Sequence, residues 1–221
     1  MNAPRAIWIS PNNAPKNAPN GAPQDAPPVA WDAIIASLRI AQRQAHPHLM
    51  SGLQAPAGRR AAVAVVLWGD ADGARQIVLV QRGFDAPRHA GELAFPGGMV
   101  EASDRDLPAT ARRELAEELG ITKQLWELGC FPDAVARSEI RFTPVFFRWD
   151  APQPHFETGP EIHQALLLPL RPLLEAAWTT EVLQIQGQKW EMPRLELPSA
   201  PLWGATALVL RRWLDGLQSA L

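Results

Sequence analysis

Three glutamates at helical spacing form the pattern in this 221-residue chain that most directly suggests chemistry. They are Glu114, Glu117 and Glu118 in the stretch "RRELAEELG", and residues at i, i+3 and i+4 share one side of a helix. Like charges at these spacings destabilise a helix by roughly 0.2–0.5 kcal/mol per pair. The plain alternative is a solvated charged face in which Arg113 pairs with Glu117.

Residues upstream of the glutamates favour a cation site over a solvated face. Pro96-Gly97-Gly98 is a rigid turn whose backbone can reach the helix, and Asp104 adds another acid in the loop between them. Clustered carboxylate oxygens with a backbone carbonyl suit hard cations such as Mg²⁺ or Mn²⁺. A bound cation would remove the repulsion between the carboxylates, and a local rule broken in this way usually marks function.

The elements that must position these residues read as strands mixed with a few helices. Pro108 to Leu119 predicts a helix, because proline is tolerated in a first turn and Gly120 is a typical left-handed C-cap. Further helices are predicted at 31–44 and 203–217. Strands are predicted at 61–68, 76–82, 93–95, 126–131, 141–149 and 163–168, with the first two joined by the turn residues 69–73. This mixture indicates an α/β or α+β sandwich rather than a helical bundle.

Composition divides the chain and limits its partners. Residues 1–28 hold seven of the 22 prolines and predict an extended tail, which leaves 29–221 as one domain. The net charge of −2 predicts no general affinity for nucleic acid or anionic membranes, and no apolar run approaches the ~18 residues of a membrane span.

The single cysteine, Cys130, excludes an intrachain disulfide framework and fits a reducing cytoplasm. We therefore expect a cytoplasmic protein with a small-molecule partner, and a homodimer is compatible with these features.

The stretch "GGMVEASDRDLPATARRELAEELGI", from Gly97 to Ile121, resembles the Nudix box. Asp104 takes the first acid position, where most families have glutamate, and one extra residue separates it from Arg113. This variant is similar to the box of coenzyme A (CoA) pyrophosphatases. The preceding stretch "LVQRGFDAPRHAGELAFPGG", Leu79 to Gly98, resembles the signature of the same subfamily.

Two positions depart from that upstream signature. Gly83 stands where the signature has serine, and Pro87 stands where it has arginine, although Arg88 follows at once. These departures concern substrate recognition and leave the box itself untouched. The resemblance implies a Nudix-type α/β/α sandwich with a mixed central sheet.

The resemblance also implies catalytic roles for residues in and near the box. It assigns the metals to Glu114, Glu117, Glu118 and the Gly98 carbonyl, with Glu118 as a direct ligand. It assigns Arg113 to orienting Glu117 or its neighbours by charge-assisted bonds. Asp104 is expected to brace the loop rather than to bind metal.

A general base outside the box is expected to be Glu161, with Glu157 behind it. Metal-bound hydroxide without a separate base is an equal alternative. The upstream signature implies a substrate-binding group: Arg82 and Arg88 for the diphosphate or a 3′-phosphate, His89 for a phosphate or for local bonding, and Phe95 beneath the loop.

The predicted activity is therefore metal-dependent hydrolysis of CoA or acyl-CoA to adenosine 3′,5′-bisphosphate and 4′-phosphopantetheine or its acyl form. Hydrolysis of ADP-ribose or another nucleoside diphosphate derivative is the first alternative. A non-catalytic nucleotide-binding Nudix domain is the second, but such a domain would be expected to lack a box glutamate, and all three are present.

Overall fold

The computed structural model describes residues 7–8, 29–43, 59–69, 74–136 and 140–221. Most of the predicted tail and residues 70–73 of the predicted turn lie outside the described residues. The helices are α1 (Trp31–Arg43), α2 (Leu107–Leu119), α3 (Leu170–Leu174) and α4 (Gly204–Gln218). The strands are β1 (Ile7–Trp8), β2 (Arg60–Gly69), β3 (Arg75–Arg82), β4 (Leu93–Ala94), β5 (Gly97–Met99), β6 (Leu125–Cys130), β7 (Ala134–Val135), β8 (Arg141–Trp149), β9 (Ile162–Pro169), β10 (Thr179–Ile185) and β11 (Gln188–Arg194).

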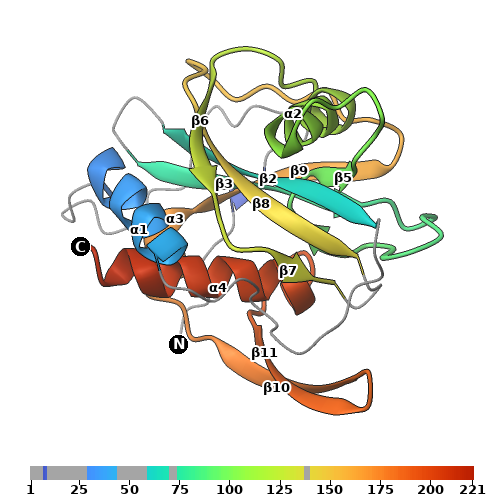
Figure 1. Cartoon of the computed structure of the whole chain (residues 1–221), viewed down its shortest axis with the longest axis vertical. Coiled ribbons are helices and arrows are strands. Elements are labelled where there is room, and N and C mark those ends of the chain that lie inside the picture. Colours follow the sequence, from blue (N-terminus) through green and yellow to red (C-terminus); the bar gives the residue numbers. More distant parts are fainter. Residues whose placement is uncertain (1–6, 9–28, 44–58, 70–73, 137–139) are drawn as a thin grey trace.

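The central sheet is mixed, and within the described residues it has nine strands. Its main path runs β1-β9-β3-β2-β8-β6, with β4, β5 and β7 paired to β3, β2 and β8 (Figure 1). The long central strands β2 and β8 are parallel, whereas the other pairs are antiparallel. Strands β10 and β11 form a separate hairpin.

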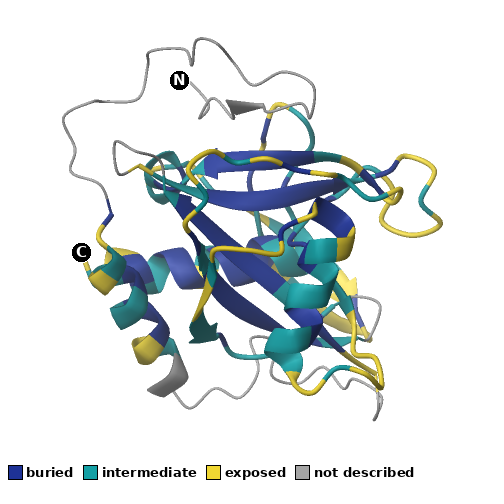
Figure 2. Cartoon of the chain, turned by 90° about the horizontal axis from the view of Figure 1, so that it is seen from above, coloured by how far each residue is buried: buried dark blue, intermediate teal, exposed yellow. Residues whose placement is uncertain are grey.

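Side chains of the central strands alternate between two hydrophobic layers, as a strand buried on both faces requires. On β2, Val65 and Leu67 belong to the layer that also contains α1 and α4, and Val66 belongs to the layer that contains α2. Figure 2 shows that the central strands are almost wholly buried. Helices therefore cover both faces of the sheet, which confirms the predicted α/β/α sandwich.

The predicted elements agree with the structure over most of the domain. The strand predicted at 141–149 has those bounds, α1 ends one residue earlier than predicted, and α4 is shifted by one residue at both ends. Sequence reasoning missed the short elements β1, β5, β7 and α3, and it missed the β10–β11 hairpin. Within the predicted tail, the described residues Ile7 and Trp8 form strand β1 and pair with Leu167 and Leu166 of β9. None of the described helices combines the length and apolar character needed to cross a membrane.

Candidate active site

Helix α2 is fixed at both ends by local signals in its own sequence. The Asp106 side chain accepts a hydrogen bond from the Ala109 N–H at 2.7 Å and caps the first turn. Gly120 takes a left-handed conformation with φ 68°, and its N–H donates to the Ala116 carbonyl. Leu115 and Leu119 are fully buried against the sheet. These constraints set the rotation of α2 and hold its glutamates at the edge of the sheet.

Strand β5 brings a glycine backbone against the same edge of α2. Gly98 pairs with Ala62 of β2, and a Cβ atom at Gly98 would collide with the carboxylate of Glu114. Gly97 has a φ of 156°, where a side chain would be strained, and its N–H donates to Glu118 Oε2 at 3.1 Å. The two glycines are therefore required for strand and helix to approach so closely.

Glu118 is the buried member of the glutamate group. It is 9% exposed, and burial raises the pKa of its carboxyl from 4.5 to about 7, although the Gly97 N–H acts in the opposite direction. Burial also raises the pKa of Glu114, which the bond from Arg113 partly opposes. The charge of Glu114 further raises the pKa of Glu118. Glu118 therefore lies inward beside the glycines, although it shares one side of α2 with Glu114 and Glu117.

Arg113 is surrounded by acceptors. Its Nη1 donates to Glu114 at 2.8 Å and to Glu117 at 3.0 Å, and its Nη2 donates to the Met99 carbonyl at 2.8 Å. Nε and Nη2 also donate to the two oxygens of Asp104, each at 3.2 Å. These bonds orient the glutamates from within the protein, as the predicted positioning role requires.

Asp104 holds the loop that leads into α2. Its carboxylate accepts bonds from the Glu101 N–H at 2.9 Å and the Thr110 hydroxyl at 2.9 Å, in addition to Arg113. The Arg113 bond is the main reason that the pKa of Asp104 falls from 3.8 to about 2. All of these contacts brace the loop, in agreement with the role predicted for this acid.

Arg82 joins the box to residues far along the chain. Its Nη2 donates to Glu161 Oε2 at 2.9 Å, and its Nη1 lies 4.0 Å from Glu118 Oε1. Its Nε is buried and forms no hydrogen bond with the described residues. The Gly83 N–H donates to the Glu161 carbonyl at 2.8 Å and fixes the two segments side by side.

A glycine that sequence reasoning missed brings Glu161 to this position. The loop before Glu161 caps the last turn of α2, because the Glu157 and Gly159 N–H groups donate to the carbonyls of Leu119 and Glu118 at 3.0 and 2.9 Å. A Cβ atom at Gly159 would lie 2.6 Å from the Glu117 carbonyl oxygen. The sequence signal was a glycine between two acids, which is a common turn composition and gave no hint of this contact.

Hydrogen bonds, ion pairs or close packing connect seven of the predicted site residues, whereas three of the substrate-binding group form no such contact with them among the described residues. The seven are Arg82, Gly98, Arg113, Glu114, Glu117, Glu118 and Glu161. Arg88 lies exposed on the loop after β3 and forms no ion pair with the described residues. His89 has a φ of 58°, and its Nδ1 bonds Glu92 Oε2 at 3.0 Å, which matches the local-bonding alternative.

The position of Phe95 corrects the prediction that this residue binds the substrate. Its side chain is 4% exposed and belongs to the hydrophobic layer of α1 and α4, on the face of the sheet opposite α2. It therefore cannot contact a substrate at the glutamates. The strand alternation that places Leu93 in the core places Phe95, two residues later, on the same side.

The donor set suits a divalent cation, although the described residues contain no group of three or more His, Cys, Asp or Glu arranged to hold one. Arginines are the partners of these carboxylates in the structure: Arg113 bonds Glu114 and Glu117, and Arg82 lies beside Glu118. The register also directs the Gly98 carbonyl towards Ala62, because Gly98 lies between two positions bonded to β2. Two adjacent carboxylates with raised pKa nevertheless form the environment that a hard cation would stabilise.

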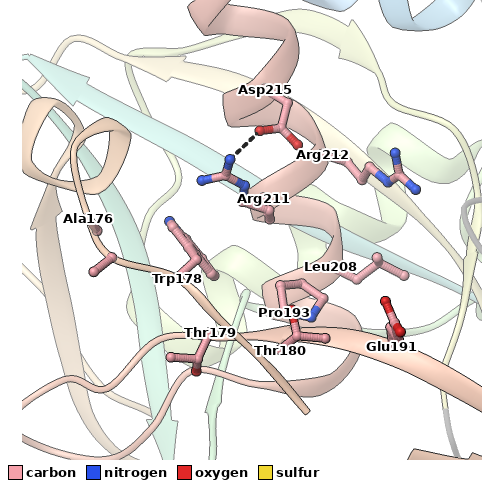
Figure 3. Close-up of a pocket in the computed structure, with 11 residues that line it drawn as sticks. Ala176, Trp178, Thr179, Thr180, Glu191, Pro193, Leu208, Arg211, Arg212 and Asp215 are labelled. Carbon is pink, nitrogen blue, oxygen red and sulfur yellow. Dashed lines mark ion pairs between the residues drawn. The ribbon is translucent and has the colours of Figure 1, made fainter. Parts of the chain in front are cut away.

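A pocket of about 540 Å³ lies elsewhere, between α4 and the β10–β11 hairpin (Figure 3). Its wall includes Trp178, Arg211 and Asp215. Arg211 is paired with Asp215 at 2.7 Å, and the Trp178 indole N–H donates to the Leu173 carbonyl. Two arginines and two acids line this pocket, so its formal charges are equal, and α4 lies on the face of the sheet opposite α2. The glutamates, rather than this pocket, form the candidate active site.

Comparison with known proteins shows the family to which the chain belongs. A model of the NUDIX domain matches residues 58–184, which is more than half of the chain and includes the whole of α2. The chain belongs to the Nudix hydrolase family.

The chain matches only part of the length of its curated Nudix relatives. Nudix hydrolase 22, chloroplastic, of Arabidopsis thaliana is 28% identical over 162 residues, which covers 70% of this chain and 54% of that protein. A probable nudix hydrolase of Schizosaccharomyces pombe is 29% identical over 169 residues, covering 72% and 56%. Nudix hydrolase NudL of Salmonella newport, described as uncharacterized, is 40% identical over 70 residues, covering 31% and 36%. The chain thus spans about half the length of the first two relatives.

Two solved structures are similar to this chain at low sequence identity. A MutT/nudix family protein from Enterococcus faecalis superposes with a TM-score of 0.49 and 13% identity, covering 77% of this chain and 66% of that one. The MutT protein from Methanosarcina mazei gives a TM-score of 0.48 and 18% identity, covering 76% and 96%.

Proposed function

We propose that this Nudix protein hydrolyses the phosphoanhydride bond of nucleoside diphosphate derivatives with Mg²⁺ or Mn²⁺, and that its substrate is CoA or acyl-CoA. The products would be adenosine 3′,5′-bisphosphate and 4′-phosphopantetheine or its acyl form. Family membership supports the reaction class, and the signature-like stretch from Leu79 to Gly98 supports the substrate.

The observation that carries the proposal is the burial of two neighbouring carboxylates beside a glycine backbone. A solvated charged face would leave Glu114 and Glu118 in water, yet burial raises the pKa of both. Retaining acids in such a place costs stability unless a positive partner is supplied. Arg82 alone does not neutralise Glu118, because their closest atoms are 4.0 Å apart.

The roles of the residues follow from their contacts. Glu114, Glu117 and Glu118, with Gly98 beside them, would hold the cation. When bound, the cation supplies charge neutralisation on the diphosphate oxygens and lowers the pKa of a water molecule. Arg113 keeps Glu114 and Glu117 in place, since its bonds to Asp104 and Met99 anchor it to the loop.

Glu161 would act as the general base, and the bond from Arg82 to its carboxylate at 2.9 Å supports this role. The oxygen of a water molecule attacks one phosphorus, and the bond from that phosphorus to the bridging oxygen breaks. The bridging oxygen leaves with the other phosphate, and Glu161 accepts the proton of the attacking water. Arg82, whose side chain is 24% exposed between Glu118 and Glu161, would also bind a phosphate oxygen.

The test is a substrate panel with the purified full chain. CoA, acetyl-CoA, ADP-ribose, NADH and dinucleoside polyphosphates are each incubated with Mg²⁺ or Mn²⁺, and products are separated by chromatography. We expect the highest kcat/KM for CoA or its acyl ester, and loss of turnover with a chelator. Preference for ADP-ribose would overturn the substrate assignment. Nucleotide binding without hydrolysis of any compound would favour the non-catalytic alternative. The homodimer and the cytoplasmic location stay predictions.

A further inference from the structure

Phe84 presents an aromatic ring to solvent next to the candidate active site. It is 67% exposed, the largest exposed fraction among the large hydrophobic side chains that the structure describes. It lies two residues after Arg82, which bridges Glu118 and Glu161. Exposing a phenylalanine costs hydrophobic free energy, so an exposed ring beside a charged site calls for a physical explanation.

The ring is held in place on two sides. The His163 ring packs against it in a T-shaped arrangement, with 4.9 Å between ring centroids and an interplanar angle of 68°. Its other support is Gly91, where a Cβ atom would lie 2.9 Å from ring carbon Cε1. Gly91 has a φ of 71°, so glycine is required there both for conformation and for space.

The loop that carries Phe84 is closed by hydrogen bonds. The Gly91 N–H donates to the Gly83 carbonyl at 3.3 Å, and the Arg82 N–H donates to the Glu92 carbonyl at 3.0 Å. The Gln81 side chain donates to the Gly91 carbonyl at 3.0 Å. These bonds tie the loop to the end of β3, so the ring is pre-ordered and a ligand would not have to pay for ordering it.

We infer that Phe84, supported by His163 and Gly91, is the surface on which the purine base of the substrate stacks. The inference rests on the proposed function, because it places the purine half of that substrate. A flat apolar ring that is 67% exposed fits a planar base, and stacking needs no hydrogen-bond partner. Arg82 and Glu161 lie beside the same loop, so a base on Phe84 would leave the diphosphate near the glutamates.

The test measures equilibrium binding of ADP and of inorganic pyrophosphate by calorimetry in Mg²⁺. Phe84→Ala should weaken ADP binding about ten-fold and leave pyrophosphate binding unchanged, because only ADP carries a base. Phe84→Trp should restore ADP binding, and Phe84→Leu should not, since leucine keeps apolar bulk without a π face. Trp126→Ala is the matched control: Trp126 is 62% exposed on β6, and its removal should change neither ligand.

Three outcomes would overturn the inference: equal ADP affinity in wild type and Phe84→Ala, an equal loss for ADP and pyrophosphate, or no ADP binding by wild type. The proposed reaction is tested separately by the substrate panel. CoA hydrolysis with an unaffected Phe84→Ala variant would remove the stacking surface and keep the reaction. If ADP binding depended on Phe84 but no compound were hydrolysed, the stacking surface would be kept and the proposed reaction would be removed.

Discussion

Two arginines hold the glutamates of this Nudix domain, and they do so differently. Arg113 lies inside the box, two turns before the end of α2, and directs its bonds to Asp104, Met99, Glu114 and Glu117. Arg82 lies outside the box, bonds Glu161, stands 4.0 Å from Glu118, and keeps a buried Nε without a partner among the described residues. All three side-chain nitrogens of Arg113 donate to groups of the protein, whereas Arg82 bonds fewer groups and can still exchange them for a ligand. Arg113 is therefore expected to maintain the site, and Arg82 to meet the substrate.

The largest expected effect comes from Glu118, the glutamate that faces Arg82. Glu118→Gln should reduce turnover by roughly 10³-fold or more, a loss of about 4 kcal/mol, because the amide cannot supply a negative charge to a cation. The fold should be retained, since the amide oxygen can still accept from Gly97. Steady-state kinetics measure the turnover, and far-UV circular dichroism measures whether the fold is retained.

Glu191→Gln is the control for this change. Glu191 lines the pocket between α4 and the hairpin, and its substitution should leave turnover unchanged. Near-normal activity of Glu118→Gln would remove Glu118 from the site.

The site could be predicted from sequence only where its residues are close along the chain. The spacing of the glutamates, Pro108 and Gly120 were enough to place α2, and the structure has those bounds to within one residue. The bridge from Arg82 to Glu161 depends on the pairing of β3 with β9, so no local pattern reveals it. The inward position of Glu118 depends on the approach of β5 and was hidden for the same reason.

The missed hairpin is different, because its signal was present. Gln186 and Gly187 connect β10 and β11 and both have positive φ, which is the requirement of a two-residue hairpin turn. The flanking strands are mostly polar and β11 contains Pro193, so their alternation is weak. Phe95 was misassigned for a third reason: closeness to a motif was taken as closeness to the site, although alternation along the chain places the ring on the other face.

The pH dependence of stability gives the next largest effect. Burial raises the pKa of Glu118 to about 7 from 4.5, so the folded protein favours the neutral acid. This contribution is fully present below pH 4.5 and is lost as pH rises through 7. In chelator, wild type should therefore lose about 3 kcal/mol more unfolding free energy between pH 4 and pH 8 than Glu118→Gln does.

Urea denaturation of both proteins across this pH range measures the difference. Comparing the two proteins cancels the other titrating groups, which they share. Parallel curves for the two proteins would contradict the burial of a titrating carboxyl at Glu118.

The smallest effects distinguish the two arginines directly. Arg113→Lys should lower kcat about 10²-fold and also lower the unfolding free energy by about 1–2 kcal/mol, because one ammonium cannot bond Asp104, Met99 and two glutamates together. Arg82→Lys should instead raise KM about ten-fold with little change in stability, because Arg82 forms fewer bonds within the protein than Arg113 does. Kinetics and urea denaturation of both variants provide the measurements. If Arg82→Lys lost stability and kcat while KM stayed constant, Arg82 would be a second anchor, and the phosphate would have to be bound by another cation such as Arg88.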